Sequence, residues 1–238
     1  MTTALCSLLR GGVPADLSAL KPTGLGDNDP FADQRLIAWQ GERRAAIGQV
    51  TWHGSLYHAR YTHTELFVVH SGVLLLEAGA TALHIKAGEA ALIPQGTAIS
   101  IRATAPVQWS FCSATAANIG IEQPVQKIDF AVPLKPSSQP AAEVLLSSEP
   151  QCRSGGVFAD EDIKVRVGIW DSTPYTRKEI PHRLNELMYL LEGSVTLTDK
   201  AGTPHVFNQG DIVFVPKGTP CAWHSPVMVK KLYWVQET

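Results

Sequence analysis

Residues 185–223 read NELMYLLEGSVTLTDKAGTPHVFNQGDIVFVPKGTPCAW, and this stretch decides the fold. Val, Ile, Tyr and Thr dominate the runs ELMYLLEG, SVTLT and DIVFV, whereas Gly, Pro, Asp and Asn lie between them. The first group of residues favours strands and the second favours turns. An E-x6-G spacing begins at Glu186, and a G-x5-P-x-G spacing begins at Gly210. We therefore predict a meander of short β-strands joined by tight turns.

The same pattern occurs a second time, nearer the start of the chain. The E-x6-G spacing recurs from Glu65 in ELFVVHSG, and G-x5-P-x-G recurs from Gly88 in GEAALIPQG. Upstream of these, WHGSLY beginning at Trp52 matches WDSTPY beginning at Trp170. Because the matches follow one another in the same order with only small changes in spacing, they indicate an internal duplication. The sequence therefore predicts two similar β-barrels in one chain.

Together the two spacings resemble the two-part signature of the cupin superfamily. The sequence segments EGSVTLT and GDIVFVPKGT, followed by a Trp, are similar to those of the small predicted-enzyme cupins first described as a domain of unknown function. It is also similar to the C-terminal half of the ureidoglycine aminohydrolases, which are bicupins. The resemblance implies an all-β fold, a bicupin of tandem duplicated antiparallel jelly-roll barrels with interior cavities.

The duplication and the proline-rich stretches predict the organisation of the chain. We expect a lead-in at 1–30, a first cupin barrel at 31–115, a connector at 116–150 and a second cupin barrel at 151–238. A short helix is expected near Ala15–Leu20, and the lead-in is expected to cover a sheet edge. In the connector, the runs VQKIDF and AEVLLS are each expected to add a strand.

Composition limits the classes of partner. The 238 residues carry a formal net charge of −2 and a pI near 6.4, so we expect no nucleic acid and no membrane as partner. No apolar run reaches the length of a membrane span, and the first residues do not resemble a signal peptide. The four cysteines show no paired spacing, which favours free thiols in a reducing cytoplasm. The expected partners are a small-molecule ligand and a second copy of the chain, in a homodimer.

The cupin resemblance implies four metal-ligand positions in each barrel, H-x-H-x3-4-E followed by a His after the P-x-G turn. In the second barrel these positions hold Ile180, His182, Glu186 and Cys221. A set of His182, Glu186 and Cys221 suits a divalent metal such as zinc or iron. The alternative is a lapsed site, in which His182 hydrogen-bonds Glu186 and Cys221 packs as a small apolar side chain.

In the first barrel the corresponding positions are assigned to His58, Arg60, Glu65 and Ile99. Because arginine cannot ligate and stays charged, we expect no metal there and expect Arg60 to pair with Glu65. A non-standard metal site from His58, His63 and Glu65 is one alternative. Another is a polar cluster of histidine, carboxylate and arginine, which is either structural or able to bind a carboxylate ligand.

Two function classes fit these residues. The first is an enzyme acting on a small polar metabolite in the second barrel, as a metal-dependent hydrolase, isomerase or oxygenase. In that class Tyr175 and Lys178 are candidate catalytic acid/base groups, and Trp223 belongs to the pocket. The second class is a non-catalytic ligand-binding or scaffold cupin with decayed metal sites, which Arg60, Ile99 and Ile180 favour.

Overall fold

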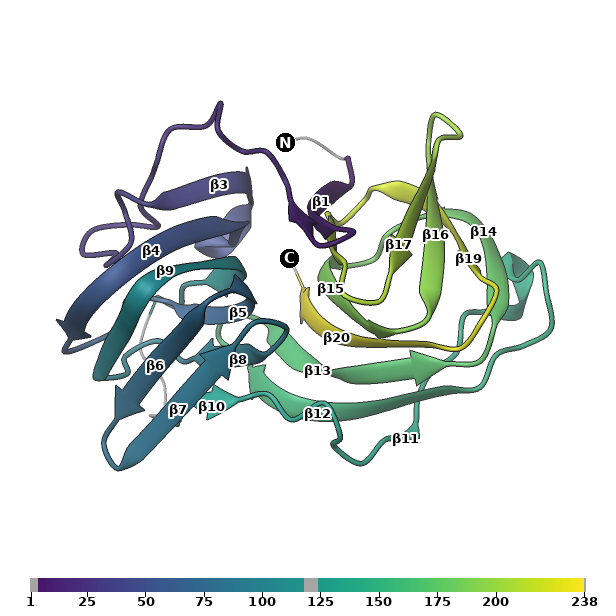
Figure 1. The fold of residues 1–238 in the computed structure, drawn as a ribbon. Coiled ribbons are helices and arrows are strands. Elements are labelled where there is room, and N and C mark those ends of the chain that lie inside the picture. Colours follow the sequence, from purple (N-terminus) through teal and green to yellow (C-terminus); the bar gives the residue numbers. More distant parts are fainter. Residues whose placement is uncertain (1–3, 118–123, 238) are drawn as a thin grey trace. The chain divides into compact units, whose positions relative to one another are not determined.

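The computed structural model describes residues 4–117 and 124–237, and their regular secondary structure is almost entirely antiparallel strand (Figure 1). Contacts divide them into two units. Asp16–Ile128 form the first unit, and the second combines the chain from Asp129 with the N-terminal segment up to Ala15. Within the described ranges the helices are two short 3-10 turns, η1 (Glu42–Arg44) and η2 (Ala142–Val144). The expected all-β class is therefore confirmed, and no helix of the described chain could cross a membrane.

The first unit is a single antiparallel sheet that surrounds its own apolar core. Its long strand β9 serves both halves of the sheet, because one end pairs with β5 and the other with β6. The strands are β3 (Arg35–Gln40), β4 (Ala46–His58), β5 (Thr64–Ser71), β6 (Val73–Ala78), β7 (Thr81–Lys86), β8 (Ala90–Ile93), β9 (Ile99–Ala114) and β10 (Gln126–Lys127).

The second unit is built from two antiparallel sheets around a shared core, as in a jelly roll. The eight-stranded sheet has the order β11-β12-β13-β20-β15-β18-β1-β2, and the four-stranded sheet has the order β14-β19-β16-β17. The strands are β1 (Cys6–Arg10), β2 (Val13–Pro14), β11 (Lys135–Pro136), β12 (Cys152–Asp160), β13 (Val165–Ser172), β14 (Tyr175–Pro181), β15 (Asn185–Glu192), β16 (Ser194–Asp199), β17 (Pro204–Asn208), β18 (Ile212–Val215), β19 (Pro220–Ser225) and β20 (Val229–Gln236).

Side chains alternate along the motif strands as expected for a barrel wall. In β15 the residues after Glu186 that share its face, Met188 and Leu190, lie in the core of the second unit. In β5 the residues after Glu65 that share its face, Phe67 and Val69, lie in the core of the first. The prediction that these residues point inward is therefore confirmed. Both glutamates consequently project into a barrel interior, where a charge needs partners.

The glycine that ends E-x6-G has a structural reason to be glycine. Gly193 joins β15 to β16 with a φ of +78°, a conformation that other residues adopt only with strain. A Cβ atom at this position would lie 2.0 Å from the carbonyl oxygen of Met228. The turn therefore requires both the left-handed conformation and the missing side chain, which explains why this spacing marks the fold.

We expect Gly193→Ala to lower the free energy of unfolding by about 3 kcal/mol, because backbone strain and a backbone clash act together. Gly210→Ala is the matched control. Gly210 has a φ of +90°, but a Cβ atom added there would meet nothing within 4 Å, so its cost should be about 1 kcal/mol. Urea unfolding of the two variants measures the difference. Equal losses would show that the contact with Met228 does not matter.

The lead-in and the connector differ partly from expectation. Residues near Ala15–Leu20 form a turn and not the expected helix. Ahead of them β1 pairs with β18, so the lead-in does cover a sheet edge, and that edge belongs to the second unit. In the connector VQKIDF contains β10, as predicted, whereas AEVLLS forms η2 and a single bridge from Leu145 to Arg177. The 3-10 turn in AEVLLS leaves only Leu145 extended beside another strand, so this run forms a single bridge and not a strand.

Candidate functional site

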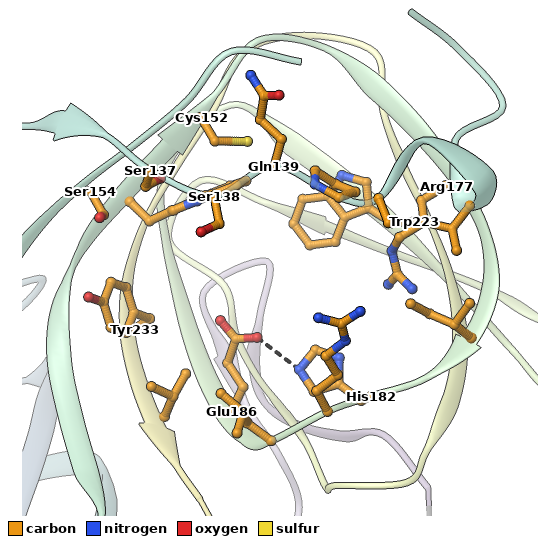
Figure 2. A pocket seen from close by; sticks show the side chains of 18 of the residues that line it. Ser137, Ser138, Gln139, Cys152, Ser154, Arg177, His182, Glu186, Trp223 and Tyr233 are labelled. Atoms are coloured by element: carbon orange, nitrogen blue, oxygen red, sulfur yellow. Dashed lines mark hydrogen bonds and ion pairs between the residues drawn. The ribbon is translucent and has the colours of Figure 1, made fainter. Parts of the chain in front are cut away.

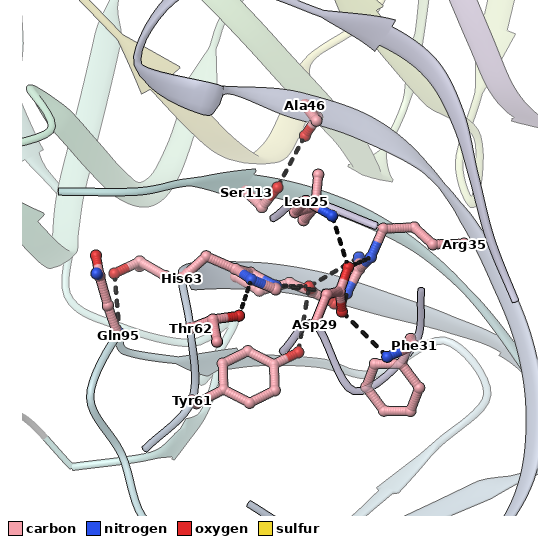
Figure 3. A network of polar contacts seen from close by, with 12 residues as sticks. Leu25, Asp29, Phe31, Arg35, Ala46, Tyr61, Thr62, His63, Gln95 and Ser113 are labelled. Atoms are coloured by element: carbon pink, nitrogen blue, oxygen red, sulfur yellow. Dashed lines mark hydrogen bonds and ion pairs between the residues drawn. The ribbon is translucent and has the colours of Figure 1, made fainter. Parts of the chain in front are cut away.

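The first unit contains a buried polar network in which Asp29, Arg35 and His63 lie close together (Figure 3). Glu65 is its fourth charged member. Arg35 places Nη1 2.9 Å from Glu65 Oε2, and its Nε lies 2.8 Å from Asp29 Oδ2. His63 Nε2 lies 2.7 Å from the same Glu65 oxygen, and the Tyr61 hydroxyl donates to it at 3.3 Å. The side chains of Arg35, Asp29, Glu65 and His63 are at most 1% exposed. These charges are therefore paired among themselves, away from solvent.

The network leaves no room for a ligand. The cavity beside Glu65 and Tyr61 has a volume of about 10 Å³, which is about the smallest space that one water can occupy. Burial alone would raise the pKa of Glu65, but the Arg35 guanidinium and the hydrogen bond from His63 lower it below its usual range. The carboxylate is thus held charged by fixed partners, and this arrangement fits a structural role.

The structure changes the assignment of positions in the first barrel. Gly96 N donates to the Tyr61 carbonyl at 2.7 Å, just as Gly218 N donates to the His182 carbonyl at 2.8 Å. Tyr61, and not Arg60, is therefore the equivalent of His182. The sequence assignment placed four residues between this position and Glu65. The hydrogen bond to Gly96 shows that three residues lie between them, as between His182 and Glu186.

Neither of the other expected members of that cluster, His58 and Arg60, pairs with Glu65. Arg60 is exposed, and the arginine that pairs with Glu65 is Arg35 from β3. His58 turns to a different partner, because its Nε2 lies 2.9 Å from the Asn28 carbonyl oxygen. Sequence spacing could not find Arg35, because it lies thirty residues before Glu65 and outside both motifs.

The second unit contains a cavity of about 680 Å³ (Figure 2). Ligand pockets usually measure roughly 300–1,000 Å³, so this volume is ample for a small metabolite. Side chains of β12, β13, β14, β15, β19 and β20 line the cavity, together with connector residues between Ser137 and Val144. Of the predicted pocket residues, the cavity is lined by Tyr175, His182, Glu186 and Trp223.

Glu186 occupies one side of this cavity with both carboxylate oxygens engaged. His182 Nε2 donates to Oε2 at 2.8 Å, the contact drawn in Figure 2, and Lys231 Nζ donates to Oε1 at 2.8 Å. Burial would raise the pKa of Glu186, but the ammonium of Lys231 and the hydrogen bond from His182 lower it to about 2. Glu186 is therefore a carboxylate at neutral pH, paired on both sides.

His182 carries a proton under ordinary conditions. Burial disfavours the imidazolium, but hydrogen bonds with Cys221 and Glu186 raise the pKa of His182 to about 9. Burial likewise raises the pKa of Cys221, but the hydrogen bond with His182 and the charge of Arg177 bring it below its ordinary value. Cys221 itself is 1% exposed and packs in the apolar core. The expected trio is thus brought together, with protonated His182 at its centre.

Two cationic side chains of the site lie outside the set of residues that the cupin spacing predicts. Lys231 and Arg177 are only 7% and 8% exposed, and both line the cavity. Lys231 Nζ lies 4.7 Å from the ring centroid of Trp170 and 5.2 Å from that of Trp223. Strand alternation places Arg177 on the same face of β14 as Tyr175, and Lys231 on the same face of β20 as Val229, and both of these neighbours lie in the core.

The aromatic wall of the cavity includes one of the two acid/base candidates. Tyr175 stacks on Trp223 with ring centroids 5.5 Å apart, and Trp170 meets Trp223 edge to face at 6.2 Å. Burial raises the pKa of Tyr175, so its hydroxyl stays protonated. Lys178, the other candidate, is exposed and is not among the lining residues. The structure therefore brings Tyr175 to the site and leaves Lys178 outside it.

The donor set does not fit a divalent metal. The ammonium of Lys231 occupies one oxygen of Glu186, and His182 Nε2 occupies the other. Arg177 Nη2 lies 3.9 Å from Cys221 Sγ, so a second fixed positive charge faces the thiol. Ile180 contributes no donor, and the described residues contain no group of three His, Cys, Asp or Glu arranged to hold a metal. Cations supplied by the chain itself already neutralise the Glu186 carboxylate.

We expect protein produced with added zinc and iron to retain much less than about one metal ion per chain after dialysis against metal-free buffer. Cys221→Ala should retain no less, because Cys221 packs in the apolar core and its sulfur already has Arg177 and His182 as partners. Elemental analysis of both proteins is the measurement. About one ion per wild-type chain that is lost in Cys221→Ala would contradict the argument from the donor set.

Comparison with known proteins agrees with the geometry. Residues 159–233 match a family model described as an EutQ-like cupin domain. A cupin 2 conserved barrel domain protein from Leptotrichia buccalis is 12% identical, with a TM-score of 0.60 over 85% of this chain and 88% of that one, and so shares the fold. The comparison with curated proteins found no match. Tandem jelly-roll units with polar motif residues inside define the protein as a cupin.

One solved structure is similar enough to identify the family. A protein of unknown function from Pseudomonas syringae pv. tomato str. DC3000, assigned to the DUF861 family, is 35% identical over 98% of this chain and 100% of its own. The two structures superpose with a TM-score of 0.92. The chain therefore belongs to the DUF861 family of cupins. The resemblance to the ureidoglycine aminohydrolases remains an expectation.

Proposed function

We propose that the second unit is a metal-independent small-molecule site, in which His182, oriented by Glu186, donates a proton to a small polar metabolite. The observation that carries this proposal is the placement of a charged histidine–carboxylate–lysine cluster against a cavity of about 680 Å³. A fully packed barrel would leave such a cluster without access to any ligand. The first unit has the opposite arrangement, with its network closed around about 10 Å³.

The chemistry available at the site is general acid catalysis. With a pKa of about 9, His182 is protonated at neutral pH, and it can donate to a basic atom of a bound metabolite that takes the place of Cys221 as its hydrogen-bond partner. Glu186 orients the imidazolium through Nε2 and stabilises its charge, while Lys231 fixes Glu186 from the opposite side. Hydrolysis and isomerisation both need such a donor, so either reaction class is compatible with these residues.

A second candidate function is ligand binding without catalysis. It is favoured by the complete pairing of Glu186, whose two oxygens are both held by cations of the chain. A carboxylate fixed in this way is a poor base, because its pKa is lowered to about 2. In this case the cluster would only shape the charge of a binding pocket.

Saturation-transfer NMR with a panel of small polyols, amides, amines and carboxylates tests the site. We expect at least one class to bind the wild type and to lose binding in Ser154→Phe, which fills the cavity. Ser148→Phe, an exposed substitution outside the lining, should keep binding. Failure of every class to bind would overturn the proposal.

Solvent exchange separates catalysis from simple binding. In D₂O, a general acid that donates to the carbonyl oxygen of a bound panel member should speed the exchange of the neighbouring C–H protons, with solvent as the base, and His182→Gln should abolish that acceleration. Binding without any accelerated exchange in the wild type would leave the non-catalytic alternative in place of the enzyme.

A further inference from the structure

Arg177 has a buried donor without a partner. Its side chain lines the cavity of the second unit and is 8% exposed. Nη2 lies near Cys221 Sγ, whereas Nη1 has no hydrogen-bond partner within the described part of the chain. Arginine stays charged at any ordinary pH, and a buried charged donor without an acceptor is costly. The unpaired nitrogen therefore points to an acceptor that enters from the cavity.

The backbone around Arg177 fixes the position of this side chain. On one side it pairs with Trp223 in β19, and on the other it forms an isolated bridge with Leu145. The pairing of β14 with β19 then shifts register between Arg177 and Ile180. Such irregularities change the direction of side chains and are frequent beside functional sites. Figure 2 shows the guanidinium turned toward the cavity between Trp223 and His182.

Charges around the cavity indicate the sign of the ligand. The lining includes four cationic groups without an acidic partner outside it in the described part of the chain, those of Arg177, Lys231, His182 and Arg183, whereas Arg166 pairs with Glu237 at 2.7 Å. Glu186 is the only acidic residue among the lining residues that the structure describes. Both oxygens of Glu186 already bind other cations, so Glu186 cannot serve Arg177. The surplus of positive charge therefore favours an anion.

We infer that the ligand is a small organic carboxylate, with its carboxylate on the guanidinium of Arg177 and its apolar or planar body against Trp170 and Trp223. A guanidinium matches a carboxylate in a bidentate geometry. The two indole rings lie next to it at the edge-to-face junction described above, and both line the cavity beside the Lys231 ammonium. This inference rests on the proposed small-molecule site and specifies the chemical class of its ligand.

Benzoate and benzamide test the inference, because they share size and shape and differ in charge. We expect benzoate to bind the wild type at least about tenfold more tightly than benzamide, since charge-assisted hydrogen bonds are the stronger ones. Arg177→Gln should remove that preference, and Arg177→Lys should keep only part of it, because lysine keeps the charge and loses the fork. Lys200→Gln, an exposed change of equal charge in the same unit, should bind like the wild type.

The outcomes distinguish the ligand class from the site itself. Circular dichroism and the melting temperature are used first to check that Arg177→Gln is folded. If it is not folded, the binding comparison is made with Arg177→Lys. Equal binding of benzoate and benzamide, or a preference unchanged in both Arg177 variants, overturns the carboxylate assignment and leaves the small-molecule site standing. If phenyl phosphate binds and benzoate does not, the ligand class is a phosphate and not a carboxylate. If neither these probes nor any neutral member of the panel binds, the proposed function fails as well.

Discussion

Replacing Arg35 by methionine is expected to lower the free energy of unfolding of the first unit by about 3–5 kcal/mol. Arg35 is fully buried, pairs with Asp29 through two hydrogen bonds and contacts Glu65 at 2.9 Å. Its removal leaves two carboxylates inside the barrel with their main counterion gone. Urea unfolding at neutral pH, followed by tryptophan fluorescence, measures the loss, because Trp109 lies beside Glu65 at 3.4 Å.

Arg102→Met is the matched control for this prediction. Arg102 pairs with Glu77 at 3.4 Å, but the two side chains are 55% and 39% exposed. An ion pair of this kind contributes about 0.5 kcal/mol or less. If Arg35→Met costs no more than Arg102→Met, the buried network does not stabilise the first unit, and its interior must tolerate unpaired carboxylates by admitting water.

The stability of the second unit is expected to have a maximum between about pH 4.5 and 6.5, set by His182 and Glu186. The pKa of His182 is raised from 6.5 to about 9, so its contribution is complete below pH 6.5 and is lost as the pH rises to 9. The pKa of Glu186 is lowered from 4.5 to about 2, so its contribution is complete above pH 4.5 and is lost as the pH falls to 2. Each loss is on the order of 3 kcal/mol at most, and the two share one ion pair.

Titration of the histidine ring protons by NMR checks the cause of the alkaline loss. Glu186→Gln should move the pKa of His182 back toward 6.5 and remove most of the loss between pH 6.5 and 9. Asp199→Asn is the control, because it removes the partner of His205 in a half-exposed pair at 2.9 Å and should change the profile little. A wild-type His182 that titrates near 6.5 would contradict the prediction.

The fold could be predicted from sequence because its signals are local and repeated. The E-x6-G spacing ends at a turn that only Gly193 fits, and alternation along β15 places Met188 and Leu190 inside. The same rules apply to Glu65 and its neighbours, so each of the two motif copies supported the fold prediction made from the other. Turn chemistry and period-two alternation depend on residues a few positions apart, which is the range over which a sequence is most informative.

The candidate site could be predicted only where it lies within the motifs. His182, Glu186 and Cys221 were identified together because the cupin spacing contains them. Lys231 and Arg177 were not assigned to the site, although both lie on inward positions of their strands. Long cationic side chains usually reach solvent, and their burial here depends on Glu186 and on an irregular strand pairing that no short pattern records.

Pairing between β1 and β18 has a consequence for synthesis on the ribosome. Gly11 N donates to Asp211 Oδ1 at 2.7 Å across a sequence separation of 200 residues. At roughly 5–20 residues per second, β1 leaves the ribosome some 10–40 s before its partner strand exists. Asp16–Ile128 can fold during this interval, whereas the second unit stays incomplete until both of its separated segments have been made. Until β18 has been synthesised, the backbone groups of β1 that will pair with it remain unpaired in the nascent chain. Chaperones have access to β1 during this period.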